Sequence, residues 1–272
     1  MIPIHVMPEM PTQAFLDALQ QQGFAGEIDT SAAQRAVYAT DNSIYERPPQ
    51  AIVCPKHVAD LQVLTRLLAE ERFRGVVVTA RGGGTGTNGQ SLTEGIVVDV
   101  SRHMNHILNI DVAKRQVRVQ AGVVKDQLNR ALKPHGLFFA PELSTSNRAT
   151  IGGMVNTDAS GQGSCTYGKT RDHVLALKTV LWGGEVLESQ ALSEQTWRED
   201  ITDLSASMQQ RFHALYELVN EHQDAIQAAF PNLNRCLTGY DLPHVLEQGR
   251  FNLNSVLCGA EGSLGLVAEA TL

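Results

Sequence analysis

The nine residues from 81 to 89 hold five glycines, in the sequence RGGGTGTNG. The backbone N–H groups of successive glycines can form a concave nest that binds an anion, typically a phosphate. Glycine suits such a loop because the chain can then adopt positive φ and approach a ligand closely. The run follows the apolar residues 75–80, which are typical of a β-strand. The pattern predicts a phosphate-binding loop at the end of a strand, with a plain flexible turn as the alternative.

The surroundings of this loop exclude two common nucleotide-binding motifs. A P-loop would end in Gly-Lys-Ser/Thr, but the chain has no lysine between Lys56 and Lys114. Gly84, Gly86 and Gly89 match the G-x-G-x-x-G pattern of a Rossmann fold. However, only residues 90–94 separate them from the next apolar run, which is too short for a crossover helix. The loop is therefore expected to hold a pyrophosphate-sized group in some other fold.

Two further segments combine glycines with small polar residues. Residues 141–161 are rich in hydroxyl and amide side chains and poor in charge. Small residues let a flat ligand lie against the backbone, while the polar groups bond its edge. A Ser/Thr/Asn-rich surface loop is the alternative. Residues 259–267 again join glycines to a strand.

Composition limits the kind of protein. The 272 residues are 43% apolar and 19% charged, with a net charge of −7, which fits an ordinary globular chain. Clusters of Lys or Arg are lacking, which disfavours a nucleic-acid partner. The sequence shows no apolar run of about 20 residues that would span a membrane, and residues 1–10 do not form a secretory signal. Four separated cysteines indicate reduced thiols and a cytoplasmic location, with no metal or iron–sulfur site in this segment.

Hydrophobic periodicity places these segments among helices and strands. Helices are expected at residues 11–22, from Pro55 to residue 68, at 124–136 with Gly136 as the C-cap, and around 204–219. Strands are expected at 52–53, 76–79, 96–100, 116–120, 174–181, 185–187 and 265–271.

Taken together, the three glycine segments resemble the FAD-binding domain of the vanillyl-alcohol oxidase and p-cresol methylhydroxylase superfamily, over residues 48–272. Residues 141–173 and 238–242 are most similar to its bacterial D-2-hydroxyglutarate and D-lactate dehydrogenases fused to a ferredoxin-like module. The resemblance implies an α+β fold of two lobes, a small α/β lobe and a lobe with a mixed or antiparallel sheet, with FAD between them. The expected divisions are an N-terminal helical extension at 1–47 and lobes at 48–110 and 111–272, the latter with a helical excursion at 190–250.

The same resemblance implies the residues of the cofactor site. They are Arg81, Gly82, Gly83, Gly84, Thr85, Gly86, Thr87, Asn88, Pro141, Ser144, Ser146, Thr150, Ile151, Gly152, Gly153, Asn156, Thr157, Ala159, Ser160, Gly161, Gly168, Glu261, Gly262, Gly265, Leu266 and Val267.

The implied activity is oxidation of a small D-2-hydroxy acid by hydride transfer to flavin N5. Another FAD-linked oxidase or reductase acting on an alcohol or sugar nucleotide, or a non-catalytic nucleotide-binding module, remains open. Covalent members carry a histidine in or just after the first glycine loop, and residues 81–89 have none, so we expect non-covalent FAD. A substrate domain, a catalytic base and the electron acceptor are expected outside this chain. An iron–sulfur cluster is expected only in such a C-terminal portion, so this chain would be a fragment with little activity alone.

The remaining polar candidates have simpler interpretations. His103 and His106 form an H-x-x-H without a third ligand and are expected at the surface. Asp172-His173 is expected to cap the following strand. Arg81 is equally suited to pyrophosphate and to a salt bridge at the end of its strand. Arg148 is expected in a solvated loop, and Glu261 is expected to order its loop.

Overall fold

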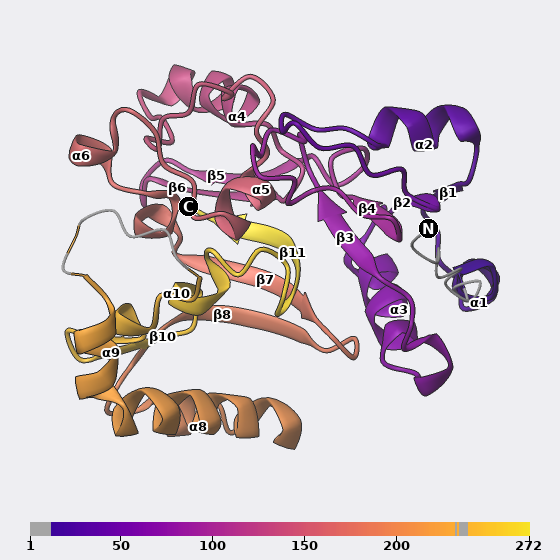
Figure 1. The fold of residues 1–272 in the computed structure, drawn as a ribbon. Helices are drawn as coiled ribbons and strands as arrows, with labels where there is room; N and C mark the ends of the chain where they lie inside the picture. Colours follow the sequence, from indigo (N-terminus) through magenta and orange to yellow (C-terminus); the bar gives the residue numbers. More distant parts are fainter. Residues whose placement is uncertain (1–11, 232, 234–238) are drawn as a thin grey trace, which may run out of the picture.

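A computed structural model describes residues 12–231, 233 and 239–272 of the chain. Figure 1 shows two lobes side by side, each built around its own β-sheet. The elements between residues 12 and 99 form one lobe, and the elements from residue 107 onward form the other. This two-lobed arrangement of helices and two sheets confirms the fold class expected from the sequence.

The first lobe has a four-stranded sheet in the order β1-β2-β4-β3. The last three strands are parallel, while β1 runs antiparallel to β2. Strands β2 and β4 are buried along their whole length, as expected for parallel strands covered on both faces. The elements of this lobe are α1 (Thr12–Gln21), β1 (Glu27–Asp29), α2 (Ala32–Tyr38), β2 (Ala51–Cys54), α3 (Val58–Leu68), β3 (Val78–Arg81) and β4 (Ile96–Asp99).

The second lobe has a seven-stranded sheet in the order β5-β6-β11-β7-β8-β10-β9, and its paired strands are all antiparallel. The last strand along the chain, β11, therefore lies in the interior of the sheet, between β6 and β7 (Figure 1). The strands are β5 (Ile107–Asp111), β6 (Gln116–Gln120), β7 (Ala176–Leu181), β8 (Val186–Ser193), β9 (Leu246–Glu247), β10 (Arg250–Asn252) and β11 (Gly265–Thr271).

Most helices of the second lobe pack into one hydrophobic core with this sheet. Helix α8 packs Met208 and Phe212 into the same core as Trp197 and Phe251. The α-helices are α4 (Lys125–Leu132), α5 (Ile151–Asn156), α6 (Ser164–Tyr167), α7 (Trp197–Asp200), α8 (Ala206–Glu221), α9 (Gln223–Ala229) and α10 (Asn254–Leu257).

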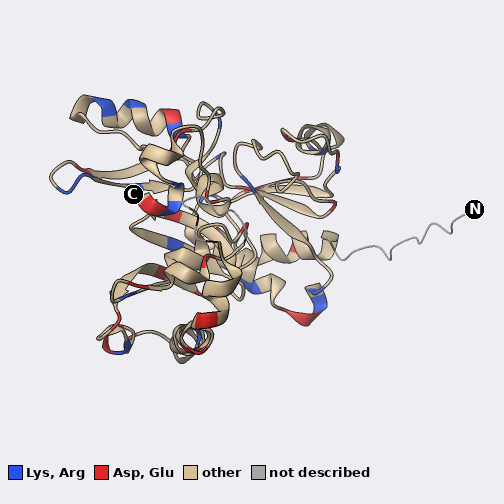
Figure 2. Cartoon of the chain, turned by 60° about the vertical axis from the view of Figure 1, so that its left-hand side comes forward, with Lys and Arg blue, Asp and Glu red and all other residues tan. Residues whose placement is uncertain are grey.

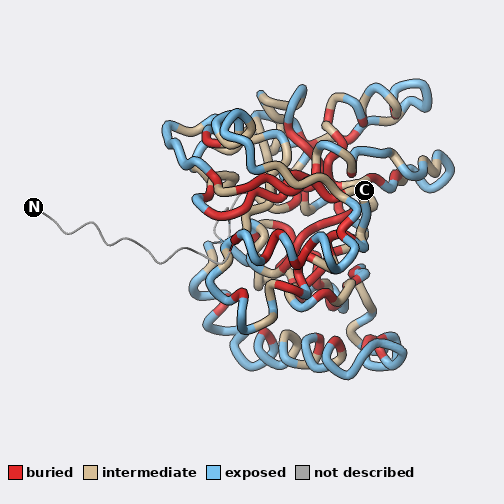
Figure 3. The backbone as a smooth tube through the Cα atoms, turned by 90° about the vertical axis from the view of Figure 1, so that its right-hand side faces the viewer, coloured by how far each residue is buried: buried red, intermediate tan, exposed pale blue. Residues whose placement is uncertain are grey.

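The two lobes share one of the hydrophobic cores. Val180, Leu266 and Ala268 of the second sheet pack with Leu61 and Leu64 of α3 in the first lobe. In Figure 3 the buried stretches of the backbone gather toward the middle of the molecule. Because this contact is apolar and buried, it fixes the two lobes relative to each other.

Most expected elements are present, with shifted ends. The helix expected to begin at Pro55 begins at Val58, with His57 as the N-cap residue. Gly136 has φ of +69° and ends a short 3-10 helix, as a C-cap glycine should. Several short elements were not expected, among them β1, α2, β5, α5 and β10. Each has seven residues or fewer, too few to show a clear period.

Charged residues are interspersed over both lobes in Figure 2. Within the part of the chain that the structure describes, no helix is long and apolar enough to cross a membrane.

Candidate functional site

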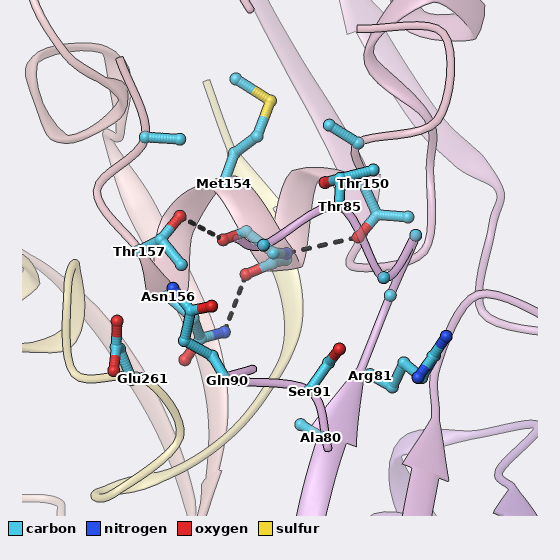
Figure 4. Close-up of a pocket in the computed structure, with 18 of the residues that line it drawn as sticks. Ala80, Arg81, Thr85, Gln90, Ser91, Thr150, Met154, Asn156, Thr157 and Glu261 are labelled. Atoms are coloured by element: carbon cyan, nitrogen blue, oxygen red, sulfur yellow. Dashed lines mark hydrogen bonds between the residues drawn. The ribbon is translucent and has the colours of Figure 1, made fainter. Parts of the chain in front are cut away.

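The three glycine segments meet at one cleft between the lobes, which we call the interlobe cleft. It has a volume of about 370 Å³, within the size range of small-molecule pockets. Figure 4 shows Asn156, Thr157 and Glu261 on one side and Arg81 and Ser91 on the other. Most of the residues expected in the site line it: Arg81, Gly82, Gly83, Gly84, Thr85, Gly86, Thr87, Thr150, Gly152, Gly153, Asn156, Thr157, Ala159, Ser160, Glu261, Gly262, Leu266 and Val267.

The other expected residues lie next to the interlobe cleft in sequence without lining it. Several have a packing role instead: Pro141, Ile151 and Gly265 are buried, and Gly161 packs against the carbonyl of Glu142. The expected residues outside the lining are Asn88, Pro141, Ser144, Ser146, Ile151, Gly161, Gly168 and Gly265.

The cleft also has lining residues that were not among the expected site residues. Gln90 and Ser91 extend the glycine loop, and Asp158 interrupts a predicted run, so proximity alone could have suggested them. Nothing in the sequence marks Val100 and Ala121 as site residues, because an apolar residue at the end of a strand can face either a core or a cleft. The full set is Ala80, Gln90, Ser91, Val100, Ala121, Leu143, Thr145, Ala149, Met154 and Asp158.

The first glycine loop touches the backbone of the opposite lobe. A Cβ atom at Gly83 would lie 2.1 Å from the carbonyl oxygen of Arg148, and one at Gly82 would lie 2.0 Å from Thr150 Oγ1. Neither distance is compatible with a side chain. The loop therefore requires glycine at these positions because the two lobes meet there.

Arg81 supports this loop from behind. Its guanidinium donates hydrogen bonds to the carbonyl oxygens of Tyr38 (3.2 Å) and Thr40 (2.7 Å), and it lies over the Tyr38 ring. Burial lowers its pKa, although the charges of Asp41 and Tyr38 oppose this shift. Of the two expected roles, the salt bridge at the strand end is absent among the described residues, since both acceptors are neutral carbonyls. The guanidinium charge thus stays uncancelled by a direct ion pair at the edge of the cleft.

Helix α5 forms one wall of the interlobe cleft, and a side chain caps its N-terminus. The hydroxyl of Thr150 accepts a hydrogen bond from the N–H of Gly153, as N-cap residues do. Gly152 N donates to the carbonyl of Ala121 (2.7 Å), which holds the helix against the end of β6. The backbone N–H groups of Gly152 and Gly153 are thus both hydrogen-bonded, and because neither residue has a side chain, this wall of the cleft is flat.

Asn156 joins this helix to the third glycine segment. Its Nδ2 donates to Gly152 O (2.8 Å), and its Oδ1 accepts from Gly262 N (3.0 Å). Its carbonyl oxygen also accepts from Glu261 N (2.9 Å). The Asn156 side chain, expected to bind cofactor, therefore already uses both ends of its amide to place residues 261–262 at the cleft.

We expect Asn156→Ala to loosen residues 259–263 and to weaken binding in the cleft by about tenfold, the equivalent of roughly 1.4 kcal/mol. Two side-chain hydrogen bonds disappear, and Gly262 N loses its partner. Hydrogen exchange of the Gly262 amide should accelerate, and a titration with the ligand should show the weaker affinity. An unchanged exchange rate would show that the carbonyl bond to Glu261 suffices. Gln209→Ala, which removes side-chain bonds on α8, is the control.

Ser160 provides a test of whether the cleft suits a polar ligand. Its Oγ atom is buried and has no hydrogen-bond partner among the described residues. Ser160 also lines the interlobe cleft. Buried hydroxyls are normally bonded, so an acceptor or donor on a ligand in the cleft would complete this one.

A second hollow of about 750 Å³ adjoins the first, and we call it the lower hollow. The two share Thr157, Asp158, Glu261 and Gly262, so they are continuous around the third glycine segment. Three aromatic side chains, Trp182, Phe230 and Tyr240, line the lower hollow, together with Arg171 and Asp241.

The other polar candidates have partners within the protein. His103 Nε2 bonds Glu27 at 2.8 Å and His106 Nδ1 bonds Gln120 at 3.0 Å, and the described residues form no cluster able to hold a metal. Asp172 caps Lys169 N at 2.8 Å. Arg148 is exposed and lines neither hollow.

Comparison with known proteins gives a family. A model described as an FAD binding domain matches residues 49–190. The chain is 61% identical to a D-2-hydroxyglutarate dehydrogenase of Pseudomonas putida, over 98% of this chain and 26% of that protein. It is 52% identical to the D-2-hydroxyglutarate dehydrogenase of Escherichia coli, over 95% of this chain and 25% of that protein.

A solved structure of alkyldihydroxyacetonephosphate synthase superposes with a TM-score of 0.65 at 20% identity, over 98% of this chain and 41% of that one. At this identity the likeness concerns the fold. The chain spans about a quarter of the length of the two dehydrogenases that it matches.

Proposed function

This chain belongs to the FAD binding domain family, and on that premise we propose that it is the cofactor-binding part of a dehydrogenase that oxidises a D-2-hydroxy acid. Its cofactor is FAD. The two D-2-hydroxyglutarate dehydrogenases support a substrate of the D-2-hydroxyglutarate type, with the D-lactate type as the alternative.

The convergence of the three glycine segments on one cleft supports this proposal most directly. The backbone amides of residues 82–87, next to the uncancelled charge of Arg81, suit the diphosphate. The flat wall of α5 and the unpartnered hydroxyl of Ser160 suit a planar ring with polar edges. Glu261, Gly262, Leu266 and Val267 complete the lining beside α5.

Bound FAD would supply the hydride-accepting N5 atom of its ring. The residues of this chain bind and orient the cofactor and shield it from water between two lobes that a buried core holds together. We propose that the electron acceptor lies outside this chain and that the protein is cytoplasmic. The free thiols of Cys54, Cys165 and Cys258 support that location.

The absorption spectrum of the chain after reconstitution with FAD tests the proposal. Flavin bands that stay with the protein through gel filtration, with reduction of the bands by D-2-hydroxyglutarate or D-lactate in the full-length enzyme, are the expected result. Reduction only by an alcohol or a sugar nucleotide would point to another oxidoreductase of this type. Retention without reduction by any of them would point to a non-catalytic nucleotide-binding module.

We further propose that FAD is held without a covalent bond. Covalent attachment needs a nucleophilic side chain, and the described residues lining the interlobe cleft include no histidine, cysteine or tyrosine. Acid denaturation of the holo-protein followed by filtration should release all of the yellow colour. Colour that stays with the denatured protein would contradict this prediction.

A further inference from the structure

A buried lysine lies directly behind the wall of the interlobe cleft. The side chain of Lys169 is 1% exposed, and its Nζ lies 2.5 Å from Asp158 Oδ2. Lysine is rarely buried so completely without a reason, because its ammonium must lose its water. Lys169 lines neither hollow, so it does not touch the ligand space itself.

Its partner, Asp158, lines both hollows and has an unusual backbone. Its φ is +43°, a left-handed value that residues other than glycine seldom adopt. Asp158 Oδ1 also accepts a hydrogen bond from Arg171 N at 3.0 Å. Such a conformation is common just after a helix, and here Asp158 N donates to Val155 O (3.1 Å) at the end of α5. Residues 169–171 add the side-chain contacts to Asp158.

The next residue is tied to the same segment. The carbonyl oxygen of Ala159 accepts two bonds from Thr170, one from its N–H (3.1 Å) and one from its hydroxyl (2.7 Å). Residues 158 and 159 are thus both fixed from behind. The residue that follows them is Ser160, which lines the cleft and whose buried hydroxyl has no partner among the described residues.

The charges extend to the wall of the lower hollow. Arg171 pairs with Asp241, and Asp241 Oδ1 lies 2.7 Å from His244 Nδ1. Lys169 and Arg171 face Asp158, Asp172 and Asp241, so the cluster has no excess positive charge. Two cations among three carboxylates do not attract an anionic cofactor, so the effect of the cluster on binding must come from the geometry that it imposes.

We propose that Lys169 is a positioning residue for the flavin, which acts through Asp158. The ion pair adds to the backbone bonds that end α5 and fixes the Asp158 side chain, so that Thr157 and Ser160 keep their places beside the cofactor. This inference rests on the proposed function, because the ligand that it positions is FAD.

The test compares Lys169→Met with the unaltered 272-residue chain, by fluorescence titration with FAD and visible circular dichroism of the bound flavin. Methionine keeps much of the length of the side chain but removes the charge. We expect the Kd for FAD to rise by about tenfold or more, with an altered dichroism spectrum. Lys178→Met is the matched control, because Lys178 pairs with Glu188 at 2.8 Å on the second sheet and lines neither hollow. It should keep the normal Kd.

A merely structural role would lower the melting temperature but leave the Kd and the dichroism of the folded variant unchanged, and that result would overturn the proposal. If Lys169→Met does not fold, Asp158→Asn decides, because it keeps the shape of the side chain but removes the charge that pairs with Lys169. A Kd raised by about threefold or more would support the proposal, and an unchanged Kd would overturn it. Failure of the unaltered chain to bind FAD would instead refute the proposed function.

Discussion

Gly83→Ala is expected to lower the affinity for FAD by about 100-fold or more, equivalent to roughly 2.7 kcal/mol. The added Cβ atom would lie 2.1 Å from the carbonyl oxygen of Arg148. That oxygen belongs to the backbone, so no rotation of a side chain can relieve the clash. The loop must move away from the second lobe, and its amides then lose their positions at the cleft. Retention of FAD in gel filtration and titration of the refolded variant measure the effect.

Gly249→Ala is the control for this substitution. Gly249 has φ of +71°, and an added Cβ atom would find nothing within 4 Å. It should cost about 1 kcal/mol of stability through backbone strain and leave the affinity for FAD unchanged. If Gly83→Ala bound FAD as tightly as the unaltered chain, the close contact between the loop and residue 148 would have no part in binding.

Gly153→Leu is expected to abolish FAD binding by filling the cleft, without disturbing the fold of the protein. Gly153 is exposed on α5 and lines the cleft, and an added Cβ atom would meet only Thr150 Oγ1, at 3.3 Å. Leucine also favours a helix more than glycine, by up to about 1 kcal/mol. The melting temperature of the apo-protein should therefore stay the same or rise, while the affinity for FAD falls by about 100-fold as the side chain fills the cleft.

Gly153→Ala completes the series, since its smaller side chain should produce an intermediate loss of affinity. The substitutions at Gly83 and Gly153 thus distinguish two causes of lost affinity: a disturbed loop and an obstructed cleft. Gly83→Ala disturbs the protein and loses the ligand as a consequence, whereas Gly153→Leu leaves the protein intact. Normal affinity in Gly153→Leu would mean that FAD does not lie against α5.

The three glycine segments could be recognised in the sequence, because close backbone approach requires residues without side chains. Their shared cleft was what the family resemblance implied. The sequence also allowed the long elements to be predicted, since their periodicity is strong. The role of Arg81 could not be predicted, because its acceptors are carbonyl oxygens of residues 38 and 40, which no side-chain pattern reveals. The Lys169–Asp158 pair was missed for a related reason. The two residues are 11 positions apart in a segment with little periodicity, and a charged pair in a loop suggests solvent and not burial.

Local sequence patterns could not predict the strand order of the second sheet either. Residues 265–271 could be assigned as a strand from their apolar character. Their place between β6 and β7 depends on partners almost 150 and 90 residues earlier in the chain, which periodicity does not specify.

The interior position of β11 has a consequence for how the protein is made (Figure 1). On the ribosome, β6 and β7 are synthesised long before the strand that joins them, so the second sheet cannot close until residue 271 has left the exit tunnel. Until then both strands offer bare edges, which readily pair with other chains. Slow translation through residues 200–265 would prolong that exposure, so the yield of folded protein in a cell should depend on elongation rate and on chaperones that shield nascent chains.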